Sequence, residues 1–217
     1  MKKLNTLKPI IVTTLLLAAG LTSCKKSTPT PVPTANTNNP VVVPTSNLYF
    51  EATINGTAVS FQDGVSMYGA GGGDESGTEP AGWQEVQNCL VMKALTTTNF
   101  GGFYIMKTFA NQPAPAEIDS MFSVKVYPYG KQSSSTSVNG IDGARVYYVD
   151  NSGVEWATDF GSGIQTGSAF SITENIANTN TYSRRISKAV FNCKLYNAAG
   201  QSMTLTNGIC RLRTVYY

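Results

Sequence analysis

The chain holds thirteen Asp and Glu residues and no histidine, so carboxylates are its main candidates for acid–base chemistry. The lack of histidine excludes Ser-His-Asp catalysis, Cys-His catalysis and imidazole-ligated zinc. Glycosidases need two carboxyl groups held across a cleft. The acids considered for such a pair are Asp74 with Glu75, Glu117 with Asp119, and Asp159. Acids scattered over loops are usually just solvated, so carboxylate-based hydrolysis is the least favoured function and we expect no enzyme.

A second candidate is the segment Asp150-Asn151-Ser152-Gly153-Val154-Glu155, which places oxygen ligands at alternate positions, as calcium loops do. It is too short for an EF-hand loop, and Asn-Ser-Gly between strands is ordinary hairpin chemistry. We therefore expect a hairpin there, with no metal and no cofactor.

Aromatic residues suggest a third site, because Tyr127, Tyr129, Tyr147, Tyr148 and Trp156 cluster around neighbouring predicted strands. Exposed Tyr and Trp can stack on sugar rings, although cross-strand packing inside a sandwich is commoner. Successive residues of a strand point to opposite faces, so one of Tyr147 and Tyr148 is expected to be exposed. The candidate ligand-binding residues are Tyr147 and Trp156.

Residues 62–82 contain seven glycines and four acids. A long loop can wrap a ligand, but this one lacks the strand–loop–helix context and the lysine of a phosphate-binding loop. We expect a mobile, solvent-exposed loop in preference to a functional one.

Beyond Cys24, three cysteines remain: Cys89, Cys193 and Cys210. An odd number leaves at least one thiol unpaired or paired between chains. On a predicted meander of strands 187–197, 201–206 and 209–215, Cys193 and Cys210 lie two strands apart. That separation of about 9.6 Å exceeds the ~7 Å reach of a disulfide. Buried thiols that pack as small hydrophobes are therefore favoured.

The elements that carry these residues start with a targeting segment. Lysines at positions 2, 3 and 8 give a positive start, residues 10–21 are mostly apolar, and Leu21-Thr22-Ser23-Cys24 closes the run. This pattern is typical of a secretory signal and is too short to span a bilayer stably. Its ending resembles the lipobox of bacterial lipoproteins, which implies that Cys24 receives a diacylglycerol and becomes the mature N-terminus. The alternative is an ordinary signal peptide that happens to carry a cysteine.

We therefore predict a signal peptide over residues 1–23 and a disordered, lipid-anchored tether over 24–46. Residues 25–46 hold five of the ten prolines and no aromatic residue, a composition that favours an extended chain without a core. The expected location is the cell envelope, on the outer membrane. The sequence does not distinguish between its periplasmic and its surface face.

Residues 47–217 read as a single all-β domain. Period-two alternation and turn signals predict eleven short strands and one short helix at 114–122. Asn55-Gly56 and Asn207-Gly208 are both predicted as hairpin turns. A two-sheet antiparallel β-sandwich is the favoured arrangement, and a lipocalin-like closed β-barrel is the alternative. This part has eleven basic and thirteen acidic residues, so we expect no nucleic-acid partner.

Three segments of the C-terminal third carry a resemblance: residues 167–173 (GSAFSIT), 189–197 (AVFNCKLYN) and 205–211 (LTNGICR). Together with residues 50–56 (FEATING), they are similar to small uncharacterised lipoproteins of the Bacteroidota. The chain departs from that pattern at Cys193 and Cys210, where Gly and Phe are expected. The resemblance implies a lipid-anchored β-sandwich and brings no activity or catalytic residues.

The favoured function is a non-catalytic binding module for a glycan or peptide, held at the membrane through Cys24. The alternative is an accessory subunit that docks onto another envelope protein through a sheet edge.

Overall fold

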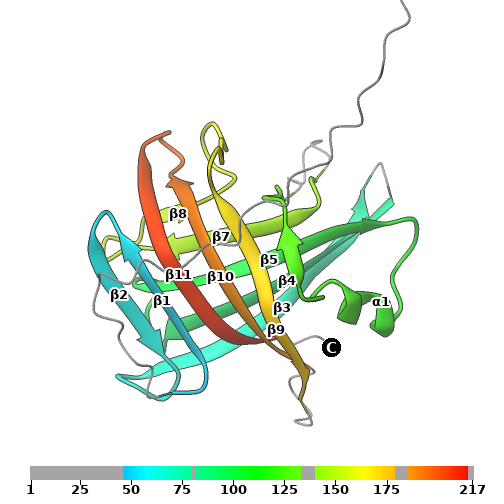
Figure 1. Ribbon diagram of the computed structural model, residues 1–217, viewed down its shortest axis with the longest axis horizontal. Coiled ribbons are helices and arrows are strands. Elements are labelled where there is room, and N and C mark those ends of the chain that lie inside the picture. Colours follow the sequence, from blue (N-terminus) through cyan, green and yellow to red (C-terminus); the bar gives the residue numbers. More distant parts are fainter. Residues whose placement is uncertain (1–45, 80–81, 133–139, 179–184, 215–217) are drawn as a thin grey trace, which may run out of the picture.

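The computed structural model describes residues 46–79, 82–132, 140–178 and 185–214. The predicted signal peptide, Cys24 and all of the tether except Ser46 lie outside the described residues. Within these ranges the chain forms eleven strands, all paired antiparallel, and one short helix, which confirms the all-β class (Figure 1). The elements are β1 (Tyr49–Ile54), β2 (Thr57–Gln62), β3 (Tyr68–Glu79), β4 (Gly82–Lys93), β5 (Phe100–Phe109), α1 (Pro115–Ser120), β6 (Lys125–Tyr127), β7 (Gly143–Val149), β8 (Glu155–Ala157), β9 (Ala169–Ala177), β10 (Arg185–Tyr196) and β11 (Ser202–Thr214).

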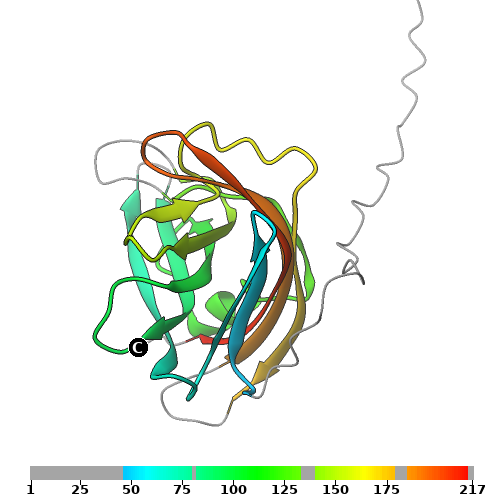
Figure 2. The same ribbon diagram turned by 90° about the vertical axis from the view of Figure 1, so that its left-hand side faces the viewer.

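The strands belong to one continuous sheet in the order β2-β1-β11-β10-β8-β7-β5-β4-β3, with β9 beside β10 and β6 beside β9. The sheet curls, so that β1, β2, β10 and β11 lie across from β3, β4, β5 and β7 (Figure 2). A single paired position, Tyr196 with Ala157, joins β10 to β8 and hence one layer to the other. The structure is therefore one curled antiparallel sheet whose two end strands in the sheet order are β2 and β3.

Closely packed aromatic rings fill the space between the layers. Phe191 of β10 lies 5.8 Å from the ring centroids of both Phe50 and Phe170. Phe170 in turn lies 5.4 Å from Phe103 of β5, in the facing layer. All four side chains are at most 1% exposed. These rings supply the large apolar burial that holds the two layers together.

The predicted Asn55-Gly56 hairpin is confirmed. Ile54 pairs with Thr57, and the two turn residues have φ angles of 46° and 82°. Both angles lie in the left-handed region, which Asn and Gly tolerate best.

The loop predicted over residues 62–82 is wrong, because most of this segment is the strand β3. It pairs with β4 along its whole length, from Tyr68 with Lys93 to Glu79 with Gly82. Glycine has low strand propensity, but the backbone hydrogen bonds to β4 need no side chain, so tertiary pairing overrides propensity here. β3 is the end strand of the sheet order.

The hairpin predicted at Asn207-Gly208 is also wrong, because β11 runs through it without a break. The register with β10 and β1 shifts nearby, and Asn207 takes a φ of 51°, so the dipeptide lies at a bulge instead of a turn. The predicted meander is therefore one strand shorter than expected.

The two C-terminal cysteines consequently lie on adjacent strands, but out of register. Cys193 pairs with Leu205, and Cys210 pairs with Ala189. Cys89, Cys193 and Cys210 are all free and buried. The preference for packed thiols is confirmed, although the strand geometry that led to it is corrected.

Candidate ligand-binding site

The two aromatic residues predicted to bind a ligand lie on opposite faces of the sheet. Tyr147 pairs with Ala157, whereas Trp156 pairs with Tyr148, which points into the core. Tyr147 is 3% exposed and its hydroxyl group bonds to Asn88 Oδ1 at 3.1 Å. Tyr148 is 9% exposed, so the expectation that one of these neighbours is exposed is wrong. The structure does not bring Tyr147 and Trp156 together into one site.

Tyr147 is buried because a charged cluster covers the outer face of β7. The Arg145 guanidinium is bonded to Asp159 at 2.6 Å and to Glu155 at 2.7 Å, and it lies over three rings, those of Tyr104, Tyr147 and Phe160. Burial lowers the pKa of Arg145, but the two carboxylates outweigh it and hold that pKa above its ordinary value. This cluster has all its charges paired, so it fixes the segment after β8 and offers little to a ligand.

The segment predicted as hairpin or calcium loop is a hairpin. Asp150 Oδ1 accepts the backbone N–H groups of Ser152 and Val154, and Oδ2 accepts the indole N–H of Trp156. Burial alone raises the pKa of Asp150, but these three hydrogen bonds prevail and lower it. In the part of the chain that the structure describes, no three metal-ligating side chains lie close enough to hold an ion.

Four of the five acids considered for hydrolysis have structural partners instead. Glu117 accepts the backbone N–H of Ala114 at the start of α1, and Asp119 pairs with Arg185 at 3.1 Å. Glu75 accepts a hydrogen bond from Gln132 at 2.6 Å. Asp159 belongs to the Arg145 cluster. These contacts bring no two of the acids together as a facing pair.

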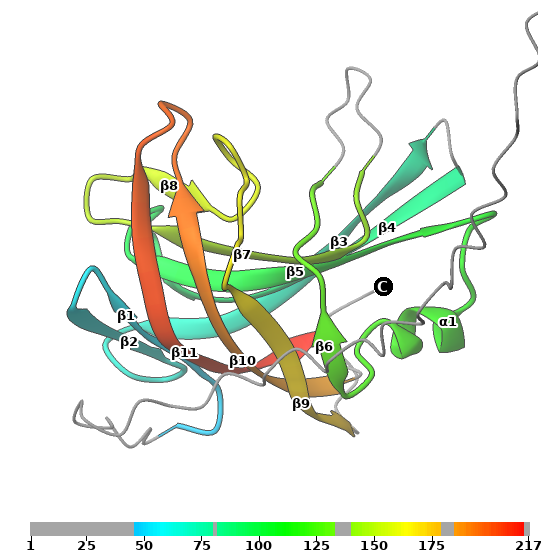
Figure 3. The same cartoon turned by 45° about the horizontal axis from the view of Figure 1, so that its top comes forward.

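A cavity of about 230 Å³ lies between β5 and the α1–β6 segment, and we call it the seam cavity. Its walls include Ile105 and Lys107 of β5, Met121 after α1, Lys125 and Tyr127 of β6, and Asp142. Figures 1 and 3 show α1 at the end of the molecule opposite the β1–β2 hairpin.

The seam cavity exists because β5 extends beyond the end of its neighbour β7. Pairing with β7 ends at Met106 and Gly143, so residues 107–109 of β5 extend beyond it. Asp142 Oδ1 accepts the Thr108 N–H at 2.8 Å and so replaces one lost strand contact. Gly143 has a φ of 146°, and a Cβ there would stand 2.4 Å from the Pro128 carbonyl oxygen. Only glycine allows this close crossing of the two chain segments.

The other wall is held rigidly by the predicted short helix, which is confirmed as α1. Pro115 begins it, and the Glu117 carboxylate accepts the backbone N–H of the N-cap residue Ala114 at 2.8 Å. The buried Tyr127 hydroxyl lies 2.7 Å from the carbonyl oxygens of both Met121 and Ser123, which ties β6 to the end of α1. Burial raises the pKa of Tyr127 far above its ordinary value, so the phenol stays neutral.

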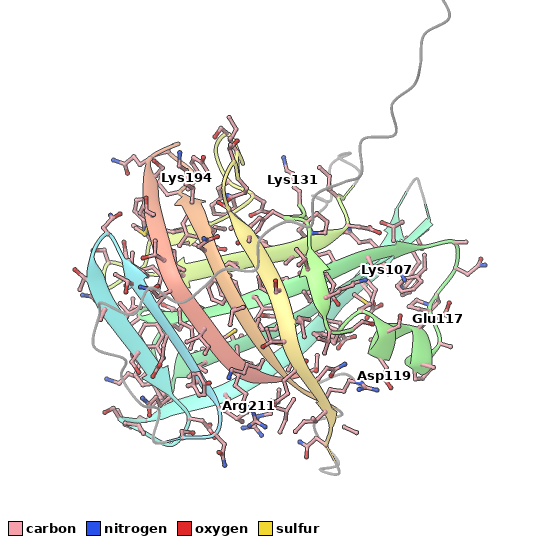
Figure 4. The ribbon with its side chains drawn as sticks, in the orientation of Figure 1. Lys107, Glu117, Asp119, Lys131, Lys194 and Arg211 are labelled. Carbon is pink, nitrogen blue, oxygen red and sulfur yellow. The ribbon has the colours of Figure 1, made fainter. Side chains whose placement is uncertain are left out.

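Two lysines and one acid, Asp142, are the charged residues that line the seam cavity. Lys107 Nζ lies 4.6 Å from the Phe109 ring centroid, and Lys125 Nζ lies 4.8 Å from that of Tyr127. Neither ammonium forms an ion pair with any described residue. Ile105 and Met121 beside them are 2% exposed and form an apolar floor. Figure 4 shows Lys107 near α1, which carries Glu117 and Asp119.

A polar row on β4 lies beside the β5 residues of the cavity, although no β4 residue lines the cavity itself. Glu85 and Gln87 pair directly with Lys107 and Ile105 across the sheet. Glu85 accepts hydrogen bonds from Trp83 Nε1 at 3.1 Å and from Gln87 Nε2 at 2.5 Å. Gln87 is fully buried, and its Oε1 accepts no hydrogen bond from any described residue. An orphaned buried acceptor needs a partner from outside the chain, such as a water or a ligand donor.

Comparisons with protein-family models, curated proteins and solved structures found no match for this chain. The resemblance to small lipoproteins of the Bacteroidota therefore stays a prediction. Over the ranges that the structure describes, no helix is long and apolar enough to span a bilayer.

Sequence reasoning missed the lysines of the seam cavity. Lys107 and Lys125 are 18 positions apart, and nothing in their local sequence marks them as neighbours. The only local signal is the Pro115 helix start, which predicts an interruption between two strands.

Proposed function

We propose that this protein is a non-catalytic binding protein that captures a carboxylate-bearing group of a glycan or a peptide. The observation that carries the proposal is the seam cavity, in which an apolar floor lies beside two lysines without ion-pair partners among the described residues. Hydrogen bonds between ammonium and carboxylate groups are among the strongest that a protein offers.

The cavity volume sets the size of the captured group. Pockets for drug-sized ligands run from roughly 300 to 1,000 Å³, and the seam cavity, at about 230 Å³, is smaller. It fits one sugar residue or one amino-acid residue, so the ligand is the end or a single unit of a longer polymer. A uronic acid and a free peptide C-terminus share the required chemistry, a carboxylate on a compact body.

Binding by the purified full-length protein in detergent would test this proposal. It should retain acidic glycans but not their neutral counterparts, or peptides with a free C-terminus but not the amidated forms. Binding in the glycan comparison would identify the ligand as an acidic sugar, and binding in the peptide comparison would identify it as a peptide C-terminus. Absence of binding in both arms would refute the proposal.

The double variant Lys107→Met/Lys125→Met should weaken that binding by roughly tenfold or more, because it removes both charge-assisted contacts. Lys194→Met is the matched control, because Lys194 is exposed at the far end of β10 and does not line the cavity. Figure 4 shows Lys194 and Lys107 well apart. Equal losses in both proteins would point to a general charge effect and reject the site.

We further propose that acyl chains on Cys24 hold the protein in the outer membrane. The support comes from the lipobox-like ending at Leu21-Thr22-Ser23-Cys24. At roughly 0.8 kcal/mol per buried methylene, two or three chains bind almost permanently. Cys24→Ala should release the protein from the membrane fraction, and mass spectrometry should find the acyl groups in the native protein alone.

The second candidate function, an accessory subunit that docks through a sheet edge, is favoured by one feature of β3. Gly69, Gly73 and Gly77 lie on one face of this end strand, and no described atom comes within 4 Å of a Cβ placed on them. None of these glycines has a positive φ. These glycines are therefore required neither by a close contact within the described chain nor by a positive φ. A glycine in a strand can also mark the close approach of another backbone, which here would be a strand of a partner. Gly73→Thr should abolish co-purification of such a partner and leave the fold intact.

A further inference from the structure

Two neighbouring turns present large apolar side chains to solvent. Val65 and Met67 lie in the β2–β3 turn and are 43% and 67% exposed. Leu95, in the β4–β5 turn, is 104% exposed, and Met92 at the end of β4 is 37% exposed. The Ala94 N–H donates to the Met67 carbonyl oxygen at 3.0 Å, so the two turns touch. We call Val65, Met67, Met92 and Leu95 the turn patch. Single exposed apolar residues are ordinary, but a contiguous group marks an interaction surface.

The backbone holds this patch in a strained but fixed form. Met67 and Leu95 have φ angles of 67° and 63°, which bulky residues rarely adopt. The turn of Val65 and Met67 is closed by two backbone hydrogen bonds, from Gly64 to Tyr68 at 2.8 Å and from Tyr68 to Val65 at 2.9 Å. Strain that persists at a rigid, exposed site usually serves a function.

The turn patch lies where the predicted tether joins the domain. The Leu48 carbonyl oxygen accepts the N–H of Asp63, the residue that precedes the β2–β3 turn. Ser46 begins the described chain only two residues before Leu48, and Cys24 lies 22 residues before Ser46. Lys93 follows Met92 and forms no ion pair with any described residue. Two arginines lie nearby but are ion-paired within the protein, Arg213 with Asp63 at 3.8 Å and Arg211 with Glu174 at 2.9 Å. Apolar side chains beside basic ones are typical of protein surfaces that rest in the headgroup region of a bilayer.

We infer that the turn patch contacts the lipid bilayer and orients the anchored domain on it. This inference rests on the proposed lipid anchor at Cys24. Figure 1 shows the β2–β3 turn at the lower left and α1 at the right. With the turn patch in the headgroups, the seam cavity beside α1 faces away from the membrane and toward soluble polymers.

Fluorescence quenching by brominated lipids tests the contact. Met67→Cys, Leu95→Cys and the control Ile164→Cys are labelled with bimane in the lipidated full-length protein, since the three native thiols of the domain are buried. Ile164 is 58% exposed, and its carbonyl oxygen accepts the Tyr196 hydroxyl at the end of β10, away from the turns. The proteins are reconstituted in vesicles of phosphatidylethanolamine and phosphatidylglycerol with brominated acyl chains.

The labels at positions 67 and 95 should be quenched at least about threefold more strongly than the label at 164. Equal quenching at all three positions, with the protein floating on the vesicles, overturns the bilayer contact and leaves the anchor intact. In that case the turn patch belongs to a protein partner. Protein that fails to float refutes the anchor and, with it, this inference. Ligand binding by the seam cavity is measured in detergent and is unaffected by either result.

Discussion

Glycines occur inside strands in two regions of this protein, and they do opposite things. In the centre, Gly208 of β11 and Gly101 of β5 lie against the rings of Phe191 and Phe50. A Cβ would stand 2.4 Å from the ring at Gly208 and 2.9 Å from the ring at Gly101. On the edge strand β3, the Cβ positions of Gly69 and Gly73 meet no described atom within 4 Å.

The difference shows that the glycines of the edge strand β3 and the glycines of the central strands have different physical causes. The central glycines make room for the rings that join the two layers, so their role is complete within the chain. The edge glycines cost strand stability without making room for anything described. Their cause must lie in a partner or in tolerance of an exposed edge.

The sharpest test of the comparison is Gly208→Ala. A methyl group there collides with both the ring and the carbonyl oxygen of Phe191, which pairs with it directly. We expect a loss of about 3 kcal/mol in the free energy of unfolding, because overpacking forces backbone movement. Urea denaturation measures it. Retained stability would show that the centre is less closely packed than the structure indicates.

Gly101→Ala should have a smaller effect, about 1 to 2 kcal/mol of destabilisation. The colliding atoms belong to the outer part of the Phe50 ring, which can shift within its packing. The double variant Gly101→Ala/Phe50→Leu should lose less than the sum of the two single variants, since the smaller side chain removes the collision. Strict additivity in urea denaturation would argue against the contact.

Gly73→Thr should have the opposite sign and stabilise the isolated protein by about 0.5 to 1 kcal/mol, because threonine prefers extended backbone. Gly56→Thr is the matched control. It too has open space around its Cβ, but its φ is 82°, so that substitution should destabilise the β1–β2 hairpin. If thermal unfolding shows Gly73→Thr to be destabilising, the edge glycines have a role within the chain after all.

The smallest expected effect concerns the charge of Glu51 on β1, the strand next to the end strand β2. Burial raises the pKa of Glu51 above its ordinary value of 4.5, against the opposing hydrogen bonds from Ser60 and Gln62. A carboxyl group with a raised folded-state pKa adds stability at low pH and loses that contribution as pH rises from about 4.5 through the folded pKa. Glu51→Gln should therefore gain stability relative to the parent protein as pH increases across that window. Urea denaturation at several pH values measures the difference, and a constant difference would contradict the shift.

Local patterns in the sequence predicted most of the strands and the short helix. Phe50, Ala52 and Ile54 alternate with polar residues and do form a buried strand, and Asn55-Gly56 forms the expected turn. These features depend on neighbouring residues, so one segment of chain carries enough information. The prediction failed at β3, where hydrogen bonds from β4 outweigh the weak propensity of glycine. It failed again at Asn207-Gly208, where pairing with two neighbouring strands keeps a turn-forming dipeptide inside β11, with Asn207 in a left-handed conformation at a bulge.

The candidate site could not be predicted in this way. Lys107 and Lys125 line the same cavity only because β5 extends beyond β7, and because the chain after α1 returns along this extension. Tyr147 looked available for a ligand, yet Arg145 and the segment after β8 cover it. The sequence by itself determined the all-β class, the hairpin of β1 and β2 and the amino-acid types available for binding. The tertiary structure alone decided which of them meet, because contacts between distant segments depend on strand order and register that no short window of sequence contains.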